Sequence, residues 1–336
     1  MDPASPMHAE EKALLARASQ AANTGQLGDA VKLFTEACRK FPHNVRAHVL
    51  LADVLLLDWF PPAEQLATVR KLIDHTLRAF PDSGEAKQRA ERLQAKETQI
   101  TAVEQGKKRL EEFEGKHRGE RCVIIGNGPS LNRMDLSFLK DEFCFGLNRI
   151  YLGFERFGFT PTYLVAVNRF VIEQSAADLT KVPCTKFISF EGVPSVMPAD
   201  DLIVINPRTW EDVFSTDPRQ GVCIGSTVTY VAMQLAFWMG FDDVVLIGVD
   251  HKFATQGTPH AVVESQGSDP NHFDPNYFGK GIKWQLPDLK NSEQMFRIAD
   301  AYFRAYRNKI VDATLDGACQ VFEKAHYKDI FFPSGA

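Results

Sequence analysis

Asparagine side chains closely follow the short apolar runs in the last two thirds of the chain. Four of them hold such positions: Asn127, Asn148, Asn168 and Asn206. Three arginines come one or two residues after an asparagine: Arg149, Arg169 and Arg208. Amides donate and accept hydrogen bonds and guanidinium groups bind anions, so the set suits a ligand with hydroxyls, a base edge and an anionic group. The alternative for each asparagine is a turn residue that bonds its own backbone.

The most specific motif is the turn Gly126-Asn-Gly-Pro-Ser130, which follows the apolar run 121–125. Gly126 and Gly128 let the backbone turn sharply and approach a ligand. Pro129 and Ser130 suit the first turn of a helix whose N–H groups face an anion. The motif therefore predicts a phosphate or nucleotide turn. It differs from the dinucleotide fingerprint because Leu131 stands at the third glycine position.

A second turn of this kind contains Ser226 and Thr227, after the apolar run 222–224. Hydroxyl side chains at a helix start satisfy backbone N–H groups, and the same N–H groups can bind an anion. The turn predicts either a second anion site or an ordinary helix cap.

Histidines gather in a segment over 248–284, which has no clear periodicity and the composition of an active-site loop. Three lie there: His251, His260 and His272. Imidazole suits a general base near neutral pH. Three carboxylates are close in sequence: Asp250, Asp269 and Asp274. A metal site and a merely hydrogen-bonded loop are the competing interpretations, although no H-x-x-x-H or H-E-x-x-H spacing supports a metal.

The elements that position these residues belong to an α/β domain with a largely parallel sheet, because short apolar runs alternate with amphipathic stretches from residue 120 on. We expect seven strands: 121–125, 143–147, 162–167, 185–190, 202–205, 222–224 and 244–248. One helix should run from Ser226 or Thr227 to Met239, closed by Gly240, and another from Ser292 to about Arg307. Ligands bind beyond the carboxyl ends of parallel strands, which is where the asparagines lie.

Residues 8 to about 118 are rich in Ala, Leu, Glu, Lys, Arg and Gln and have apolar residues at helical spacing. The offsets of a tetratricopeptide helix pair are filled by apolar or small residues: Leu14, Ala18, Ala21, Ala30, Phe34, Ala37 and Pro42. The turn Phe80-Pro81 echoes Phe41-Pro42, with an insertion at 60–62. The region resembles one good and one degenerate tetratricopeptide repeat, followed by a helix over about 84–114.

This pattern predicts a tetratricopeptide-like helical domain over 1–100, a linker helix over 101–118 and the α/β domain over 119–336. The change in composition lies near Gly115–Gly119. Two repeats bury their own faces poorly, so the helices either bind a protein partner or only cap the second domain.

The 336 residues carry a net charge of −5, which disfavours nucleic acid as a partner. Six cysteines are scattered singly, as reduced thiols would be. The first thirty residues lack an apolar signal region, and no segment approaches the length of a membrane span. We therefore expect a cytoplasmic protein without a membrane span.

Three motifs, together with Asn148, carry a resemblance to known families over roughly residues 119–332. They are Gly126-Asn-Gly-Pro-Ser-Leu131, Gly225-Ser-Thr227 and Met239-Gly-Phe-Asp-Asp-Val-Val-Leu-Ile-Gly-Val-Asp250. The chain resembles the bacterial sialyltransferases of glycosyltransferase family 42, together with the motility-associated flagellin glycosyltransferases. It also resembles the domain named after archaeal hydroxymethylpterin diphosphokinase. Both resemblances imply a Rossmann-like fold.

The sialyltransferase resemblance implies roles for particular residues. Asn127, Gly128 and Ser130 would hold a cytidine nucleotide, Asn148 the sugar and ribose, and Ser226 and Thr227 the nucleotide. His272 is the best-placed loop histidine for the base. Where the sialyltransferases have Arg-Cys-Asn-Gln, this chain has Gly-Leu-Asn-Arg149, which leaves the donor sugar open. The diphosphokinase resemblance rests on the longer Leu-Ile-Gly-Val-Asp form of the late motif and on His260-Ala261.

The sequence thus predicts a transferase that moves a sugar from a nucleotide donor, CMP-linked by resemblance, to a hydroxyl acceptor, which the repeats would select if it is a protein. His272 would be the base, Tyr277 a donor to the leaving phosphate, and no metal or tightly bound cofactor would be needed. The alternative enzyme transfers diphosphate from ATP to a pterin-like alcohol, with Asp250 as the natural Mg²⁺ ligand. A repeat scaffold without catalysis is the third candidate.

Overall fold

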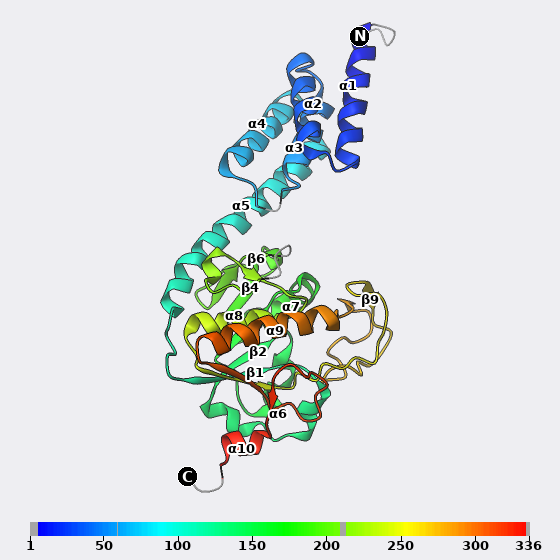
Figure 1. Cartoon of the computed structure of the whole chain (residues 1–336). Coiled ribbons are helices and arrows are strands. Elements are labelled where there is room, and N and C mark those ends of the chain that lie inside the picture. The colour runs from blue at the N-terminus through cyan, green and yellow to red at the C-terminus, as the bar shows by residue number, and fades with distance from the viewer. Residues whose placement is uncertain (1–5, 59, 209–212, 334–336) are drawn as a thin grey trace. The chain divides into compact units, whose positions relative to one another are not determined.

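A computed structural model describes residues 6–58, 60–208 and 213–333 of the chain (Figure 1). These residues form two units that divide between Ile100 and Thr101, each with its own apolar core. Within the described ranges, no helix is long and apolar enough to cross a membrane.

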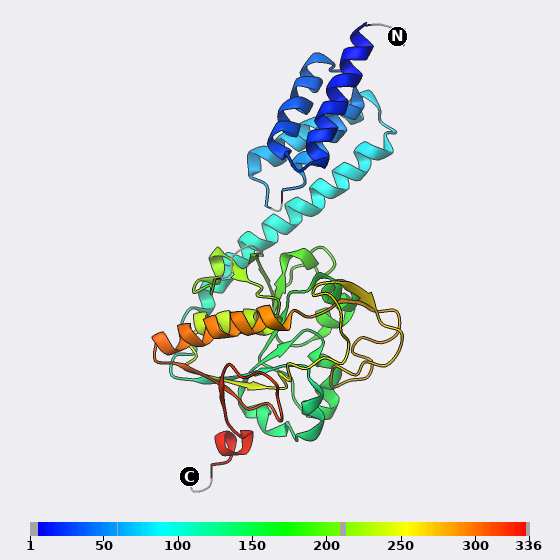
Figure 2. The ribbon, with the colours of Figure 1, turned by 45° about the vertical axis from the view of Figure 1, so that its right-hand side comes forward.

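The first unit consists of helices that lie side by side (Figure 2). They are α1 (Pro6–Asn23), α2 (Leu27–Lys40), α3 (Val45–Leu55), α4 (Ala63–Ala79) and the first part of α5 (Gly84–Leu110). Ala18, Ala30 and Ala52 are fully buried, so neighbouring helices pack through small side chains, as the repeat pattern predicts. Phe41 and Phe80 follow the ends of α2 and α4, which confirms that the two turns hold equivalent positions.

The second unit contains an eight-stranded sheet in the order β12-β11-β8-β1-β2-β3-β4-β5, parallel throughout. Its strands are β1 (Arg121–Ile125), β2 (Phe143–Leu147), β3 (Tyr163–Ala166), β4 (Thr185–Ser189), β5 (Leu202–Ile205), β8 (Asp243–Ile247), β11 (Lys309–Asp312) and β12 (Glu323–Lys324). The chain enters at β1 in the middle, builds one half of the sheet through β5, and returns to β8 to build the other. The Rossmann-like α/β fold is thereby confirmed.

The remaining elements include two small sheets. β6 (Pro207–Arg208) pairs with β7 (Val222–Cys223), and β9 (Val262–Glu264) pairs with β10 (Lys283–Gln285). The helices of this unit beyond α5 are α6 (Phe154–Phe157), α7 (Arg169–Lys181), α8 (Val228–Met239), α9 (Leu289–Ala305) and α10 (Tyr327–Phe331).

All seven expected strands form, and six of them belong to the main sheet. The run 222–224 forms β7, which pairs with β6 in a separate two-stranded sheet. The sequence analysis missed β11 and β12, which are short and carry charged residues, so they lack a distinctive apolar pattern.

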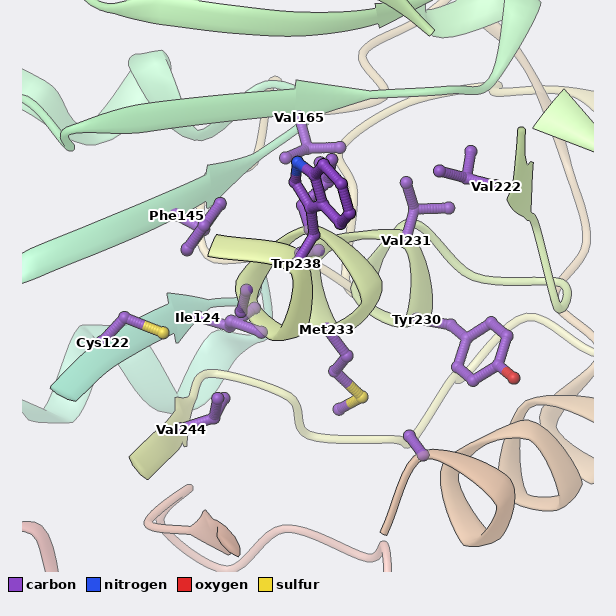
Figure 3. Packing of buried hydrophobic residues seen from close by; sticks show 14 of the residues in the cluster. Cys122, Ile124, Phe145, Val165, Val222, Tyr230, Val231, Met233, Trp238 and Val244 are labelled. Carbon is purple, nitrogen blue, oxygen red and sulfur yellow. The ribbon is translucent and has the colours of Figure 1, made fainter. Parts of the chain in front are cut away.

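Helix α8 forms the centre of the core (Figure 3). Ten of its twelve residues are buried, because it packs against β1, β2 and β3 and also against α9. A helix that is apolar on all sides is one buried on all sides. Thr227 caps its start by accepting from the N–H of Thr229, and Gly240 ends it with a left-handed backbone at φ 84°, as the sequence predicts.

Residues 101–118 are packed into the second unit and do not form a free linker helix. Helix α5 ends at Leu110, whose carbonyl accepts a hydrogen bond from Trp238 Nε1 at 3.0 Å. The N–H groups of Gly115 and His117 donate to the carbonyls of Trp238 and Met239 at the end of α8, at 2.9 and 2.8 Å. The segment is therefore fixed by backbone contacts.

Gly106 allows α5 to lie directly on the sheet. A Cβ atom there would be 1.9 Å from the carbonyl oxygen of Val204 in β5. We expect Gly106→Ala to lower the free energy of unfolding of the second unit by roughly 1–3 kcal/mol, because helix and strand must separate. Gly84→Ala, in the same helix with nothing within 4 Å, is the matched control and should leave stability nearly unchanged. Urea denaturation of both variants measures the difference, and equal midpoints would contradict the close contact.

Candidate functional site

A cavity of about 750 Å³ lies at the carboxyl ends of the parallel strands. Its lining comes mainly from the segments that follow β1, β2, β3, β4, β7 and β8, from the loop over 250–288 and from the start of α9. At the centre of this edge, β1 and β8 are neighbouring strands. The chain continues from β1 into one half of the sheet and from β8 into the other half. Such a switch point is where open α/β sheets bind ligands.

Most of the residues singled out from the sequence meet in this cavity: Gly126, Asn127, Gly128, Asn148, Asn168, Ser226, Thr227, Asp250, His260, His272 and Tyr277. Three of them do not line it: Ser130, Arg149 and Asn206. The topology therefore brings most of these residues together at one edge of the sheet, as expected. The side chains differ in whether their hydrogen-bonding groups are already paired within the protein.

The turn after β1 touches the end of β8 through its backbone. The N–H groups of Gly126 and Gly128 donate to the carbonyls of Ile247 and Gly248, both at 2.8 Å. A Cβ atom on Gly128 would lie 2.1 Å from Asp250 Oδ1. The second glycine is thus required by a contact within the protein, whereas the sequence analysis assigned it to close approach of a ligand.

Asp250 occupies the start of the short helix that follows this turn, the 3₁₀ helix η2 (Pro129–Arg133). One carboxylate oxygen accepts from the backbone N–H of Ser130 at 3.0 Å, and the other accepts from its hydroxyl. The expectation that Ser130 binds a ligand anion stays a prediction, and in this structure a carboxylate of the protein fills that position. Asp250 correspondingly positions the turn.

Asn127 and Asn148 keep unused hydrogen-bonding capacity at the switch point. Asn127 donates its amide to the carbonyl of Leu147 at 3.0 Å, and Asn148 has a left-handed backbone with φ 49°. The side-chain carbonyl oxygen of each is buried and accepts no hydrogen bond from any described residue. Buried acceptors are costly when unpaired, so both oxygens are suited to hydroxyl or amino hydrogens of a ligand.

Asn168, Ser226 and Thr227 line the cavity but serve local structure. Asn168 caps α7 by accepting from Val171 N–H at 3.2 Å, and Thr227 caps α8. Ser226 Oγ accepts from the Asn291 side chain at 2.7 Å. Asn168 and Thr227 are thus helix caps, and Ser226 instead makes a contact with α9. Asn206, away from the cavity, accepts from Val222 N–H with its backbone carbonyl and holds β7 beside β6.

Arg149 braces the histidine loop from behind and does not face a ligand. Its guanidinium donates to the backbone carbonyl of Tyr277 and to the hydroxyl of Tyr151, and it lies 5.8 Å from the centre of the Tyr277 ring. The nucleotide-binding role expected for Arg149 stays a prediction, and in this structure the side chain contacts the loop and does not line the cavity. A cationic fork suits backbone carbonyls as well as phosphates.

His272 and Asp269 form a dyad at the cavity wall. His272 Nδ1 lies 2.7 Å from Asp269 Oδ2, and both side chains are largely buried. Asp269 also accepts from the N–H groups of Asn271 and Phe278. Burial alone would raise the pKa of the Asp269 carboxyl, but these hydrogen bonds and the His272 charge hold that pKa below its usual value. An ionised Asp269 keeps the Nδ1 proton on its own side, which leaves Nε2 as the proton acceptor.

Tyr277 fixes the plane of the His272 ring. The two rings are stacked with centroids 3.9 Å apart and an angle of 7° between them. Burial raises the pKa of the Tyr277 hydroxyl, and this oxygen accepts from Arg149 N–H at 3.4 Å. Tyr277 is therefore placed to orient the histidine, in contrast to the expected contact with a leaving group.

The other two loop histidines are also paired with carboxylates. His251 Nε2 lies 3.3 Å from Glu293 in α9, and burial lowers the pKa of this histidine, although the Glu293 charge opposes the shift. His260 is more than half exposed, and its ring lies 3.7 Å from Asp288. His272 alone of the three combines close contact with a buried carboxylate and a fixed ring plane.

The described residues include no group of three or more His, Cys, Asp or Glu side chains arranged for a metal ion. Asp250, the Mg²⁺ ligand of the alternative sequence interpretation, has both oxygens engaged by Ser130. The donor set at this position therefore does not fit a preformed magnesium site.

Two further acids belong to the site, Glu191 in the cavity lining and Asp269 behind His272. Asp269 was noted only among nearby carboxylates, and the signal that could have found it is its place three residues before His272. Glu191 lines the cavity from the segment after β4. It has no sequence signal, because a single acid after a strand is common.

We expect Arg149→Leu to loosen the loop over 265–282. Removing a charged hydrogen-bond donor to a backbone carbonyl costs roughly 1.5–3 kcal/mol, so amide exchange in this loop should speed up at least about tenfold. Hydrogen–deuterium exchange with peptide resolution measures the effect. Arg169→Leu is the matched control, because Arg169 pairs with Glu173 on its own helix. Unchanged exchange in Arg149→Leu would show that the arginine does not brace the loop.

Comparison with known proteins finds two family matches in the chain. Residues 97–256 match the family described as 6-hydroxymethylpterin diphosphokinase MptE-like, and residues 11–54 match a tetratricopeptide repeat. Both matches confirm resemblances predicted from the sequence. A comparison with curated proteins finds no significant match.

Two solved structures share a distant likeness. The MAf glycosyltransferase from Magnetospirillum magneticum AMB-1 is 13% identical with a TM-score of 0.43, covering 79% of this chain and 47% of that one. The chain thus spans about half the length of that protein. A variant of the O-GlcNAc transferase from Thermobaculum terrenum is 12% identical with a TM-score of 0.20, covering 73% of this chain and 70% of the other. The chain is thus similar to a tetratricopeptide repeat over residues 11–54 and to the MptE-like family over residues 97–256.

Proposed function

We propose that the second unit is a glycosyltransferase that moves a sugar from a nucleotide-linked donor to a hydroxyl acceptor. The observation that carries the proposal is the His272–Asp269 dyad on a cavity at the switch point of the sheet. A base held in one tautomer beside a ligand cavity is what activation of a hydroxyl requires.

In this proposal His272 Nε2 takes the proton of the acceptor hydroxyl as its oxygen bonds to the anomeric carbon. The bond from that carbon to the phosphate oxygen breaks, and the nucleotide leaves with the electron pair. Asp269 holds the Nδ1 proton and stabilises the imidazolium that forms, and Tyr277 keeps the ring in plane. General-base catalysis of this kind contributes roughly 10²–10⁴-fold.

The rest of the cavity suits the remaining parts of such a donor. The unpaired carbonyl oxygens of Asn127 and Asn148 would accept from ribose or sugar hydroxyls. The start of α8, with Ser226 and Thr227 at the cavity wall, would face the phosphate, since helix N-termini favour negative charge. A CMP-linked donor is the class implied by the resemblance to sialyltransferases.

The tetratricopeptide region supports a protein as the acceptor. Helix pairs of this kind present a surface to polypeptides, and a transferase for a small alcohol would have no use for one. We propose that the first unit recruits the polypeptide that receives the sugar.

The second candidate is a diphosphokinase that acts on a pterin-like alcohol with ATP and Mg²⁺. The family match over residues 97–256 favours it. His272 would again take the proton of a hydroxyl, now attacking a phosphorus atom. A repeat scaffold without catalysis is the third candidate, and it binds no nucleotide in this cavity.

A thermal-shift panel of CMP, CDP, UDP, GDP and ATP, each with and without Mg²⁺, separates these candidates. We expect CMP or CDP to raise the melting temperature without metal, because a ligand that binds only the folded state stabilises it. Stabilisation by ATP only in the presence of Mg²⁺ would favour the diphosphokinase. No stabilisation by any nucleotide would contradict both enzymes and leave the scaffold.

The base is tested with His272→Ala and Asp269→Asn. We expect His272→Ala to lower kcat by about 10²–10⁴-fold and Asp269→Asn to lower it less, both with nearly unchanged affinity for the donor nucleotide. His260→Ala is the comparison, and it should change kcat little because its ring is exposed and only loosely paired. Single-turnover transfer together with calorimetric nucleotide binding measures both quantities. Full activity of His272→Ala would assign the base elsewhere.

A further inference from the structure

Glu191 is an acid at the cavity wall that the proposed reaction does not use. Its carboxylate makes no hydrogen bond or ion pair with any residue in the described part of the chain, in contrast to Asp250, Asp269 and Asp288 in the same cavity region. An acid left partly buried without a donor is unfavourable for the free protein. Such a group is a candidate for ligand recognition.

The backbone around Glu191 is held rigidly. Glu191 lies in the 3₁₀ helix η5 (Phe190–Gly192) directly after β4, and its N–H donates to Ser189 Oγ at 3.3 Å. A Cβ atom on Gly192 would lie 2.3 Å from Ile172 Cγ2 in α7, so the turn packs tightly on that helix. The Cα atom from which the Glu191 side chain extends is therefore fixed at the cavity wall.

The charged residues near Glu191 are Arg169 and Glu173, which form an ion pair with each other. Burial raises the pKa of its carboxyl, the positive charge of Arg169 opposes this shift, and the charge of Glu173 adds to it. The Arg169 guanidinium is engaged by Glu173 at 2.7 Å. Glu191 thus retains its capacity to accept a hydrogen bond from a ligand.

Glu191 also lies far from the reacting histidine along the sheet edge. The loop that carries His272 is tied to the β1 end, because Phe273 N–H donates to the carbonyl of Asn127 at 2.8 Å. β4 is the third strand from β1, which places its end roughly 14 Å away at the usual strand spacing. A ligand that reaches both His272 and Glu191 is as long as a nucleotide linked to a sugar. Glu191 would contact a part of this ligand that does not take part in the reaction.

We propose that Glu191 determines specificity by accepting a hydrogen bond from an N–H group of the bound nucleotide sugar. The inference rests on the proposed glycosyltransferase function. The N–H group belongs either to the amino group of the nucleobase or to an amino or amide group on the sugar. The hydroxyl groups of the ligand can donate to the side-chain oxygens of Asn127 and Asn148, which lie near β1 and β2. A carbonyl or anionic group opposite Glu191 would be repelled.

Two ligand pairs test the inference and separate the two sources of the N–H group. CMP has an amino group on its base at the position where UMP has a carbonyl group. UDP-N-acetylglucosamine and UDP-glucose differ in an amide N–H on the sugar. Titration calorimetry with the full chain should show about tenfold tighter binding of the N–H-bearing member in one of the two pairs. The pair that shows the preference identifies the source.

Glu191→Gln should reduce that preference to within about twofold, because an amide can turn to accept from an amino group or donate to a carbonyl. Glu155→Gln is the matched control, since Glu155 is an exposed residue of α6 outside the cavity lining, and it should keep the preference. Thermal melting of both variants checks that they are folded.

The outcomes distinguish this inference from the function on which it rests. Binding without a preference in either pair, or a preference that survives in Glu191→Gln, overturns the role of Glu191 and leaves nucleotide binding intact. Failure of all four compounds to bind the unsubstituted chain overturns the proposed function and the inference together.

Discussion

The contact between the turn after β1 and the end of β8 is the constraint on which the site depends. Gly126 and Gly128 bring the two backbones into hydrogen-bonding distance, and Asp250 closes the contact by accepting twice from Ser130. These bonds join the two halves of the sheet at their carboxyl ends. They also satisfy, inside the protein, the helix start that would otherwise attract an anion. The free acceptors of the cavity consequently lie elsewhere.

Asn127 connects the turn after β1 to the loop that carries His272. Its backbone carbonyl accepts from Phe273 in the histidine loop, while its side-chain amide donates to the end of β2. The loop itself has little regular structure, so its position depends on such anchors. Arg149 and the stacked Tyr277 supply two more. The His272 ring, paired with Asp269 and stacked on Tyr277, loses little further freedom when it meets a substrate, which is the advantage of a preorganised base.

The polar residues of the cavity fall into two physical groups. The first group has hydrogen-bond partners within the protein, at helix starts or in contacts between segments. Its members are Asn168, Ser226 and Thr227. Asn127 and Asn148 retain a buried oxygen without a donor. Only the second group gains from a ligand, because an acceptor that is already satisfied has to give up one bond to make another. The unsatisfied atoms, more than the number of polar residues, indicate what the cavity can bind.

Much of the architecture was predictable from local patterns. The apolar runs of β1 to β5 and β8, the capped helix α8 and the small residues of the repeats are short-range features, because each depends on side chains a few positions apart. Since parallel strands end at one edge, the sequence also predicted that Asn127, Asn148 and His272 would share a site. It could not predict β11 and β12, whose short charged sequences form strands only beside an existing sheet edge.

Only the tertiary structure decided which of these residues remain free. Arg149 and Asp250 have the charges of ligand-binding residues, but their partners come from 128 and 120 positions away in the sequence. Glu191 has no local signal at all, and its importance arises from the partner it lacks. Hydrogen-bond satisfaction is a property of the packed chain, because a donor or acceptor is used or unused only once distant segments lie against it. The residue types set the chemistry that is available, and packing determines where it is still available to a ligand.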